Sequence, residues 1–326
     1  MKKLVLFVAL LLLLSLATAG AQAKKVVAYT AHEDNIIASM VPRFKAETGY
    51  DLEFVKLASG DVIKRVKAEA GNPQCDVIWS IGGEQLQADS DLLEKYVPKE
   101  WAKVAPVFKV GTNWLPYTGI MNVFIVNTNL LTPAETPKGW ADLMDPKWKG
   151  KVCSATPDKS GSAYMQMNNV FLAFKDKGWD IYSPIVANFF ISTSSGAVPK
   201  FVNDGEAPIG ITLEDNAFRF VQGGGPVKIV YPVEGVIAAP DGIALVKGAP
   251  HAAAGKVFID WCLSKPTQDF LVSQMFRRPV RIDGANPPGL PPLAKIKTIP
   301  YDFVMAAGYK SAYLKEFNRL RMRLGL

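Results

Sequence analysis

The sequence is poor in the residues that most enzyme mechanisms and metal sites use. Among its 326 residues are two histidines, His32 and His251, and three widely spaced cysteines, Cys75, Cys153 and Cys262. This spacing offers no CxxC pair and so excludes the common zinc and thiol redox sites. The GxSxG, HExxH and Walker lysine motifs are also missing, which leaves most hydrolytic mechanisms without their parts. We therefore expect no enzyme and no cofactor, we assign no metal ligand, and we expect three buried thiols.

Long apolar runs are also scarce. The one clear run, Leu4–Leu16, follows a start with two lysines and precedes Ala21-Gln22-Ala23, which is the pattern of a secretory signal peptide. The run is short for a membrane span of roughly 20 residues, and no later stretch would serve as a stop-transfer helix. We expect residues 1–23 to be a signal peptide cleaved after Ala23, with Ala19 as the second choice. With no cysteine near either site to carry a lipid, a periplasmic location is predicted.

Basic residues exceed acidic ones, but they do not gather on one segment. The formal charge is +7, of which Lys2 and Lys3 contribute two, and the basic clusters are Arg277-Arg278 and Arg319–Arg323. A nucleic-acid or adhesion module would need a clustered basic face. The balance favours anionic small molecules, so we predict no nucleic-acid partner and a monomer. For Arg277-Arg278 a solvated or interdomain role is favoured over pairing with phosphate.

Short apolar runs alternate with helical patterns in the first third of the chain. Strands are predicted at Lys25–Tyr29, Leu52–Val55 and Asp76–Trp79, with helices beginning near Asn35 and near Ser59. Strand, helix and strand in succession predict a parallel sheet with crossover helices. In such sheets the ligand crevice lies at the carboxyl ends of the strands, where polar turns follow here.

The remaining chain repeats this alternation. A chain of about 300 residues after cleavage exceeds what one core usually serves, so two lobes are expected. The predicted elements are strands near 119–127, 151–154, 208–212, 227–232 and 242–246, helices after Ser160, over 251–271 and from near Val304, and a Pro- and Gly-rich connection at 286–292.

Five segments carry a family resemblance, and they occur in the order in which one class of proteins has them. They are Tyr29-Thr30-Ala31-His32, Asp76–Ser80, Asp145–Lys151, Ser160–Tyr164, and Glu234-Gly235 with Pro240–Ala244. Over the whole mature chain the sequence resembles the type II periplasmic solute-binding proteins of ABC importers, in the branch that binds ferric ion or organophosphates such as aminoalkylphosphonates and hexose phosphates.

The resemblance implies an α/β, two-lobed type II periplasmic binding protein fold. Each lobe would be a mixed, mainly parallel sheet flanked by helices, and a two-strand hinge near 117–123 and 232–238 would join them. We expect lobe 1 at 24–118 and 235–285, lobe 2 at 119–234, and a C-terminal connection and helix at 286–326 that pack on lobe 2. Lobes of this kind close on a small solute, and the cognate ABC permease recognises the closed form.

The strongest candidate for ligand binding is the segment Ser160-Gly161-Ser162. A helix start there offers unpaired backbone N–H groups, a favourable dipole end and small residues that let an anion approach. Plain N-capping by Ser160 or Ser162 is the alternative. Ser195, in a second small-residue turn, is a candidate for the same crevice, with a helix cap as its alternative.

The resemblance also indicates which residues face the other end of the ligand. His32 lies where the ferric-binding relatives carry a histidine ligand, but Leu213-Glu214-Asp215-Asn216 replaces their adjacent tyrosines, which argues against their ferric site. Carboxylates accept hydrogen bonds from hydroxyl or ammonium groups. Glu214 and Asp215 are therefore candidates, with a solvated helix start as the alternative.

Three further candidates complete the set. Glu234 lies where organophosphate-binding relatives place an acidic contact near the hinge, and a hinge hydrogen bond is its alternative. Thr30 and Ser80 stand at the ends of two predicted strands. The predicted function is capture of a small phosphorylated organic solute, a sugar phosphate or a phosphonate. The alternatives are a ferric-ion-binding protein of an iron importer and a carboxylate-based periplasmic hydrolase that uses Glu214 and Asp215.

Overall fold

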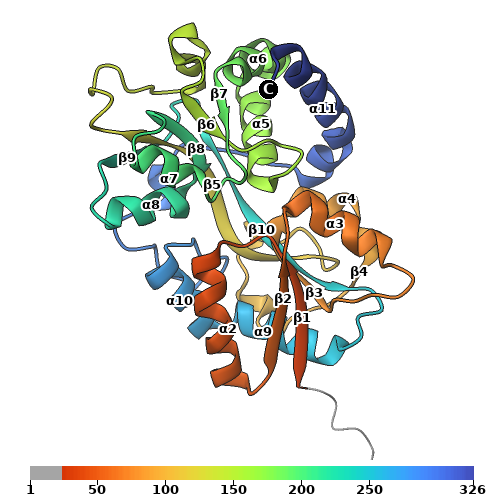
Figure 1. Ribbon diagram of the computed structural model, residues 1–326. Helices are drawn as coiled ribbons and strands as arrows, with labels where there is room; N and C mark the ends of the chain where they lie inside the picture. Colours follow the sequence, from red (N-terminus) through yellow and green to blue (C-terminus); the bar gives the residue numbers. More distant parts are fainter. Residues whose placement is uncertain (1–23) are drawn as a thin grey trace, which may run out of the picture.

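A computed structural model describes residues 24–326, so the predicted signal peptide lies outside the described residues. Its main strands follow the order β2-β1-β3-β10-β5-β8-β6-β7 in one curled mixed sheet. Figure 1 shows this sheet passing through two lobes, one above the other. We call them the β1 lobe and the β8 lobe after a strand in each.

The β1 lobe begins with parallel strands and crossover helices. Its strands are β1 (Lys25–Thr30), β2 (Asp51–Lys56) and β3 (Val77–Gly82), and β1 pairs in parallel with both neighbours. Its helices are α2 (Asp34–Thr48), α3 (Ser59–Ala68), α4 (Gly83–Ala88), α9 (Ala252–Leu263) and α10 (Lys265–Met275). The apolar face of α2 packs through Ile36, Met40 and Phe44 into the core of this lobe.

The β8 lobe repeats the architecture with shorter strands. They are β6 (Val152–Ser154), β7 (Phe189–Ile191), β8 (Ile209–Leu213) and β9 (Val227–Val230), with β6 parallel to β7 and β8. Its helices are α5 (Gly161–Phe174), α6 (Gly178–Ala187), α7 (Val198–Asn203) and α8 (Glu214–Gln222).

Two long strands connect the lobes. β5 (Leu115–Asn127) and β10 (Val236–Val246) pair antiparallel, with Met121 opposite Ala238 and Gly119 opposite Pro240. All of β5 is buried, so the connection is part of the core and not a surface linker. These strands overlap the two predicted hinge segments, and the predicted lobe boundaries stay a prediction. The two-lobed α/β fold class is confirmed by the solved structures described below.

The predicted helix over 251–271 is wrong in one respect, because the structure has two helices there. Ser264 lies between α9 and α10 in an extended conformation with ψ of 151°. Pro266 has no N–H to donate to the preceding turn, so a helix can restart at Lys265 but not run through it. The remaining elements are short: β4 (Leu93–Glu94), β11 (Thr298–Ile299) and 3₁₀ turns at Ser90–Leu92, Trp101–Lys103, Pro106–Phe108, Trp140–Met144, Pro146–Trp148, Lys175–Lys177 and Leu293–Lys295.

The last helix, α11 (Phe303–Leu324), touches both lobes. Ala306 and Phe317 lie in the core of the β8 lobe, whereas Phe303 packs edge-on against Trp114 with ring centroids 5.0 Å apart. Asp302 caps the helix by accepting hydrogen bonds from two backbone N–H groups. Among residues 24–326, no helix is both long and apolar enough to cross a membrane.

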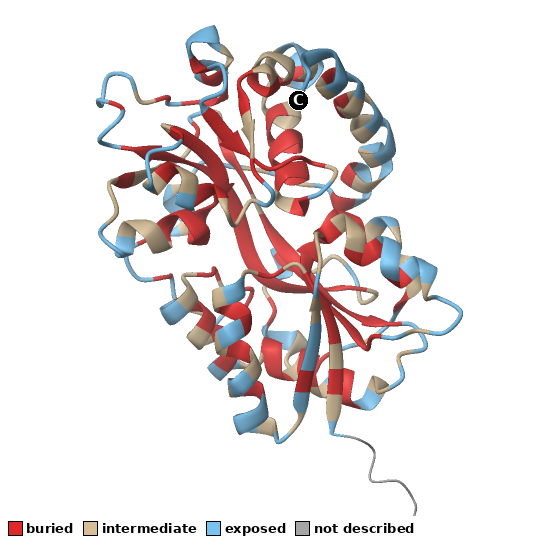
Figure 2. Cartoon of the chain, viewed as in Figure 1, coloured by how far each residue is buried: buried red, intermediate tan, exposed pale blue. Residues whose placement is uncertain are grey.

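Burial follows the sheet. In Figure 2 the central strands are buried, whereas the outer faces of the helices are exposed. Cys75, Cys153 and Cys262 are all buried free thiols, as the sequence predicts. Burial raises the pKa of the Cys75 and Cys153 thiols to about 12.

Candidate functional site

A cleft of about 650 Å³ lies between the two lobes. The β1 lobe lines it with the turns that follow β1, β2 and β3. The β8 lobe contributes the start of α5, the turn before α7 and Arg219 of α8. The cleft therefore lies at the carboxyl ends of the strands, where open α/β sheets bind their ligands.

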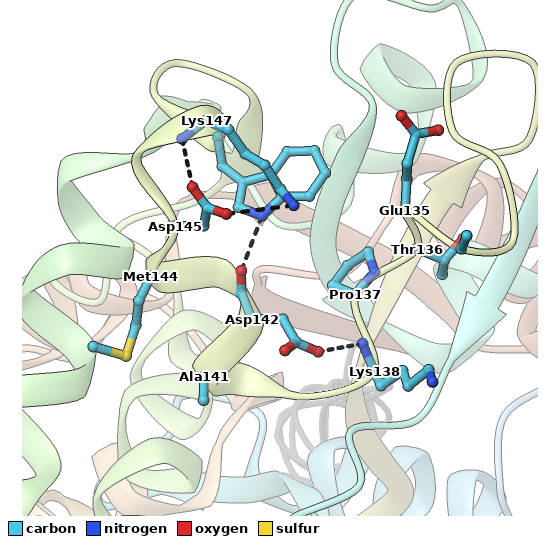
Figure 3. Close-up of a pocket in the computed structure, with 11 residues that line it drawn as sticks. Glu135, Thr136, Pro137, Lys138, Ala141, Asp142, Met144, Asp145 and Lys147 are labelled. Carbon is cyan, nitrogen blue, oxygen red and sulfur yellow. Dashed lines mark hydrogen bonds and ion pairs between the residues drawn. The ribbon is translucent and has the colours of Figure 1, made fainter.

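A second hollow of about 590 Å³ lies away from the cleft, on the β8 lobe. Figure 3 shows that its lining comes from one segment, residues 134–148. The backbone N–H of Lys138 donates to Asp142 at 2.7 Å, and the indole N–H of Trp148 donates to the carbonyl of Asp142 at 2.9 Å. No candidate ligand residue from the sequence lines this hollow.

Three serine hydroxyls meet at the start of α5. Ser160 is the N-cap, and its hydroxyl accepts a hydrogen bond from the N–H of Ala163 at 3.3 Å. The Oγ atoms of Ser160 and Ser162 are 2.9 Å apart, and Ser162 donates to Ser195 Oγ at 2.7 Å. All three serines line the cleft. We call Ser160, Ser162 and Ser195 the serine cluster, and it joins the helix start to the separate turn before α7.

Gly161 brings the two lobes close together. A Cβ atom at this position would lie 3.0 Å from the backbone nitrogen of Gly82 and 3.1 Å from its Cα, on the opposite lobe. Such contacts are tighter than side chains normally accept, so the approach of the lobes depends on glycine here. Gly161 is not itself among the residues that line the cleft.

The turn after β1 fixes His32 and Glu33. Thr30 donates to the carbonyl of Trp79 at 2.7 Å and accepts from the N–H of His32 at 3.0 Å, but it does not line the cleft. His32 does line it, and its Nδ1 is 2.8 Å from Glu33 Oε2. Burial lowers the pKa of His32, so the ring is neutral at pH 7. Burial alone would raise the pKa of Glu33. The hydrogen bonds with His32 and Asn216 and the positive charge of Arg277 together outweigh burial, so the carboxylate stays ionised.

Ser80 lines the cleft and belongs to a buried network. Its φ of 59° is left-handed, and its hydroxyl donates to Asp241 at 2.5 Å. Asp241 also accepts from the N–H and hydroxyl of Thr118 at 2.9 and 2.8 Å. Arg277 closes the network with an ion pair to Asp241 at 2.7 Å. Asp241 and Arg277 both line the cleft, although neither was predicted from the sequence as a ligand contact.

The carboxylates at the start of α8 face arginines of the other lobe. Glu214 binds Arg278 at 2.7 Å and accepts a hydrogen bond from the Tyr231 hydroxyl at 2.5 Å. Asp215 binds Arg277 at 3.1 Å. Neither acidic residue lines the cleft. The interdomain role predicted for the two arginines therefore has a geometric basis, whereas the structure places Glu214 and Asp215 behind the cleft wall.

Glu234 also lies elsewhere. Its carboxylate accepts hydrogen bonds from the backbone N–H groups of Trp140 and Ala141 at 3.1 and 3.4 Å, at the start of a 3₁₀ turn. It does not line the cleft. The alternative for Glu234 was a hinge hydrogen bond; its carboxylate does make structural hydrogen bonds, but to a 3₁₀ turn more than 90 residues earlier in the chain.

The cleft is also lined by basic residues that were not predicted from the sequence. Lys56 pairs with Asp34 at 2.6 Å, and Lys159 lies 3.7 Å from Asp61. Arg219 on α8 is half-buried and, within the described part of the chain, has no ion-pair partner. The position of Arg219 was readable from helical spacing. Arg219 lies three residues after Asn216, so the two side chains project from the same face of α8.

Comparison with known proteins decides the family. Residues 39–295 match the family described as bacterial extracellular solute-binding protein. The chain belongs to this family. A protein of undetermined function from Haemophilus influenzae is 31% identical over 313 residues, which cover 90% of this chain and 89% of that protein. A putative 2-aminoethylphosphonate-binding periplasmic protein of Salmonella typhimurium is 29% identical over 248 residues, which cover 74% and 72%.

A solved structure agrees with this assignment. The periplasmic binding protein AfuA of Actinobacillus pleuropneumoniae, with fructose-6-phosphate bound, superimposes with a TM-score of 0.85 at 25% identity and covers 93% of this chain and 99% of its own. The solute-binding protein is thus a periplasmic component of an ABC importer, which works with a permease, and its relatives are transport proteins and not enzymes. Within residues 24–326, no group of three or more His, Cys, Asp or Glu side chains is arranged to hold a metal ion.

Proposed function

We propose that this solute-binding protein captures a small phosphorylated organic solute, a sugar phosphate or a phosphonate, by closing its lobes and then delivers it to its ABC permease. The observation that carries the proposal is the serine cluster at the start of the 14-residue helix α5. Backbone N–H groups and the positive end of the helix dipole favour an anion there. Three hydroxyls within hydrogen-bond distance of one another add donors that can turn toward a phosphoryl oxygen.

The charges of the β8 lobe support an anionic ligand on the same side. Arg219 lines the cleft without an acidic partner in the described residues, and Lys159 is held only by an exposed contact of 3.7 Å. Two cations in the lining of the same cleft attract an anion from solution and can pair with it once the cleft closes. The named relatives, one a putative phosphonate-binding protein and one solved with a sugar phosphate, fit this ligand class.

The two alternatives that rely on Glu214 and Asp215 find less support. A ferric site would need their oxygens, and the expected tyrosines are replaced by Leu213-Glu214-Asp215-Asn216. A hydrolase would need at least one of these carboxylates at the cleft. Both carboxylates instead lie outside the lining of the cleft, and each is ion-paired with a buried arginine.

The remaining features of the proposal concern maturation and assembly. We place the mature N-terminus after Ala23, with lobe 1 at 24–118 and 235–285 and lobe 2 at 119–234. We propose a periplasmic monomer without a nucleic-acid partner. Mass spectrometry of a periplasmic extract that shows an intact Met1 would contradict the cleavage.

The test of the ligand class is a calorimetric titration with fructose 6-phosphate, glucose 6-phosphate, 2-aminoethylphosphonate, inorganic phosphate and ferric citrate. We expect a phosphorylated or phosphonate compound to bind, and Ser162→Ala to weaken every such compound by about tenfold through the loss of one hydrogen bond to a charged group. Ser39→Ala is the matched control, because the Ser39 hydroxyl bonds only the carbonyl of Asn35 in helix α2. Binding of ferric citrate alone, or of no phosphorylated compound, would refute the proposal.

A further inference from the structure

Among residues 24–326, one carboxylate in the lining of the cleft makes no direct ion pair with a lysine or arginine. Glu33 stands at the N-cap position of α2, and its side chain is 15% exposed. One oxygen is 2.8 Å from His32 Nδ1, and the other accepts from the side-chain amide of Asn216 at 3.1 Å. Within residues 24–326 its only salt-bridge contact is this histidine, whose ring is neutral at pH 7.

The other two carboxylates in the lining of the cleft are neutralised. Asp34 pairs with Lys56 at 2.6 Å, and Asp241 pairs with Arg277 at 2.7 Å. Glu33 differs from both because, among the described residues, no lysine or arginine lies within ion-pair distance of it. Arg277 and the two hydrogen bonds keep this carboxylate ionised without a direct ion pair, so Glu33 can still accept donors from a charged ligand group.

The β8 lobe covers Glu33 from the opposite side. A Cβ atom at Gly196 would lie 3.1 Å from Glu33 Cγ, so the turn before α7 closes directly over the side chain. Ser195 of the serine cluster directly precedes Gly196, so the Cα atoms of the two residues are about 3.8 Å apart. The hydroxyls proposed to bind the anion therefore lie next to the turn that covers Glu33. The serine cluster and the carboxylate of Glu33 thus line the same small cleft.

We propose that the solute carries a cationic nitrogen, as a primary ammonium, in addition to its phosphoryl or phosphonate group, and that Glu33 binds this nitrogen and determines specificity. The inference rests on the proposed function and narrows its ligand class to zwitterions. Each oxygen of Glu33 keeps a lone pair beyond the bond it already makes, and an ammonium offers three donors. A hydroxyl at the same place would donate a single neutral hydrogen bond, which is weaker than a charge-assisted one.

His32 and Asn216 act as positioning residues in this scheme. They donate to the two oxygens of Glu33 from different lobes and hold the carboxylate plane toward the cleft. Because Asn216 belongs to α8 and His32 follows β1, this arrangement is complete only when the lobes are closed.

The experiment uses two pairs of ligands that differ in a single amino group, titrated into the full mature chain by calorimetry. The pairs are 2-aminoethylphosphonate with ethylphosphonate, and glucosamine 6-phosphate with glucose 6-phosphate. We expect the wild-type protein to prefer the amino member of the pair that binds by at least about tenfold. Glu33→Gln should abolish this preference by weakening the amino member about tenfold or more, while the affinity of the other member stays within about twofold.

Asp34→Asn is the matched control. Asp34 is the next residue and also lines the cleft, but it is 87% exposed and paired with Lys56, so its loss should not change the preference. Should Glu33→Gln fail to fold, Glu33→Asp tests the same point, since it keeps the charge, shortens the reach and should weaken the amino member alone.

The outcomes separate this inference from the proposed function. If Glu33→Gln changes both members of a pair equally, or neither, the inference is overturned, and it is also overturned if wild type shows no preference. In each case the proposed function stands as long as Ser162→Ala still weakens phosphorylated ligands. If no member of either pair binds and fructose 6-phosphate and phosphate also fail to bind, both proposals are overturned.

Discussion

Arg278 holds Glu214 through two hydrogen bonds, Nε to Oε2 at 2.7 Å and a terminal nitrogen to Oε1 at 2.8 Å. Both side chains are almost fully buried. Arg278 follows α10 in the β1 lobe, whereas Glu214 begins α8 in the β8 lobe, so the pair joins the lobes. The carbonyl of Arg278 also accepts from the N–H of Gly119 at 2.7 Å, within the connecting strand β5. The ion pair is thus anchored next to the hinge.

Arg278→Ala should destabilise the protein by about 3–5 kcal/mol, because it leaves the buried Glu214 carboxylate without a counterion. Urea unfolding followed by circular dichroism measures the change. Lys265→Ala is the control, since Lys265 and Asp269 form an exposed pair with 50% and 46% of their side chains accessible. Its loss should cost less than about 1 kcal/mol. Similar small losses in both variants would show that the Arg278–Glu214 pair is not closed in solution.

The fold was accessible from the sequence because its signals are local. Short apolar runs predicted β1 and β3 within three residues of the observed bounds, and helical spacing predicted the start of α2 within one residue. The antiparallel pairing of β5 with β10 carries no such signal, because the partners are more than a hundred residues apart and only the family resemblance indicated a hinge there.

The candidate site was also only partly predictable from the sequence. The start of α5 was predictable because an N-cap serine and a following glycine are neighbours in the sequence. The roles of Glu214 and Asp215 were not, since their partners, Arg278 and Arg277, lie 64 and 62 residues away. Sequence alone shows a carboxylate but not the cation that already neutralises it. Glu33 illustrates the converse, because its lack of a direct ion pair with a lysine or arginine is visible only once the neighbours of the cleft carboxylates are known.

Gly161→Ala should impair closure without destabilising the fold. The added Cβ would lie 3.0 Å from a backbone nitrogen of Gly82 on the other lobe, and backbone cannot yield as a flexible side chain can. Because alanine favours a helix over glycine, the variant should unfold at the same temperature or slightly higher. Ligand affinity should fall at least about tenfold for all ligands alike, as calorimetry would show.

Gly71→Ala is the control for this closure prediction, because a Cβ there meets no atom within 4 Å. Small-angle scattering with saturating ligand would show the cause, since the Gly161 variant should stay more open than the Gly71 variant. Unchanged affinity in both variants would mean that the lobes do not approach this closely when the ligand binds.

Gly308→Ala should stabilise the protein by about 0.5–1 kcal/mol, because it reduces the entropy of the unfolded chain in the middle of α11. Gly308 is exposed, and a Cβ there meets nothing within 4 Å. Gly325→Ala should act in the opposite direction, since Gly325 ends the same helix with a left-handed φ of 70°. Thermal unfolding measures both, and a rise for Gly325→Ala would contradict the described end of the helix.

The stability of the protein should carry a pH dependence that belongs to Asp215. Burial, together with repulsion from Glu33 and Asp241, raises the pKa of Asp215 from 3.8 to about 6, although Arg277 opposes the shift. The folded protein therefore holds this proton more tightly than the unfolded chain does. The resulting stabilisation is fully present below pH 4 and is lost as the pH rises through 6, at no more than about 1.4 kcal/mol per pH unit.

Asp215→Asn mimics the protonated group and cannot lose this contribution. The difference in unfolding free energy between Asp215→Asn and wild type should therefore shift in favour of the variant by about 2–3 kcal/mol between pH 4 and pH 7. Urea unfolding at several pH values measures it. Asp204→Asn is the control, because Lys200 lowers the pKa of the exposed Asp204 carboxyl, whose stabilisation is lost only as the pH falls below its ordinary pKa of 3.8. A constant difference for Asp215→Asn across this range would mean that Arg277 keeps Asp215 ionised throughout, so that the ion pair outweighs the burial of the carboxylate.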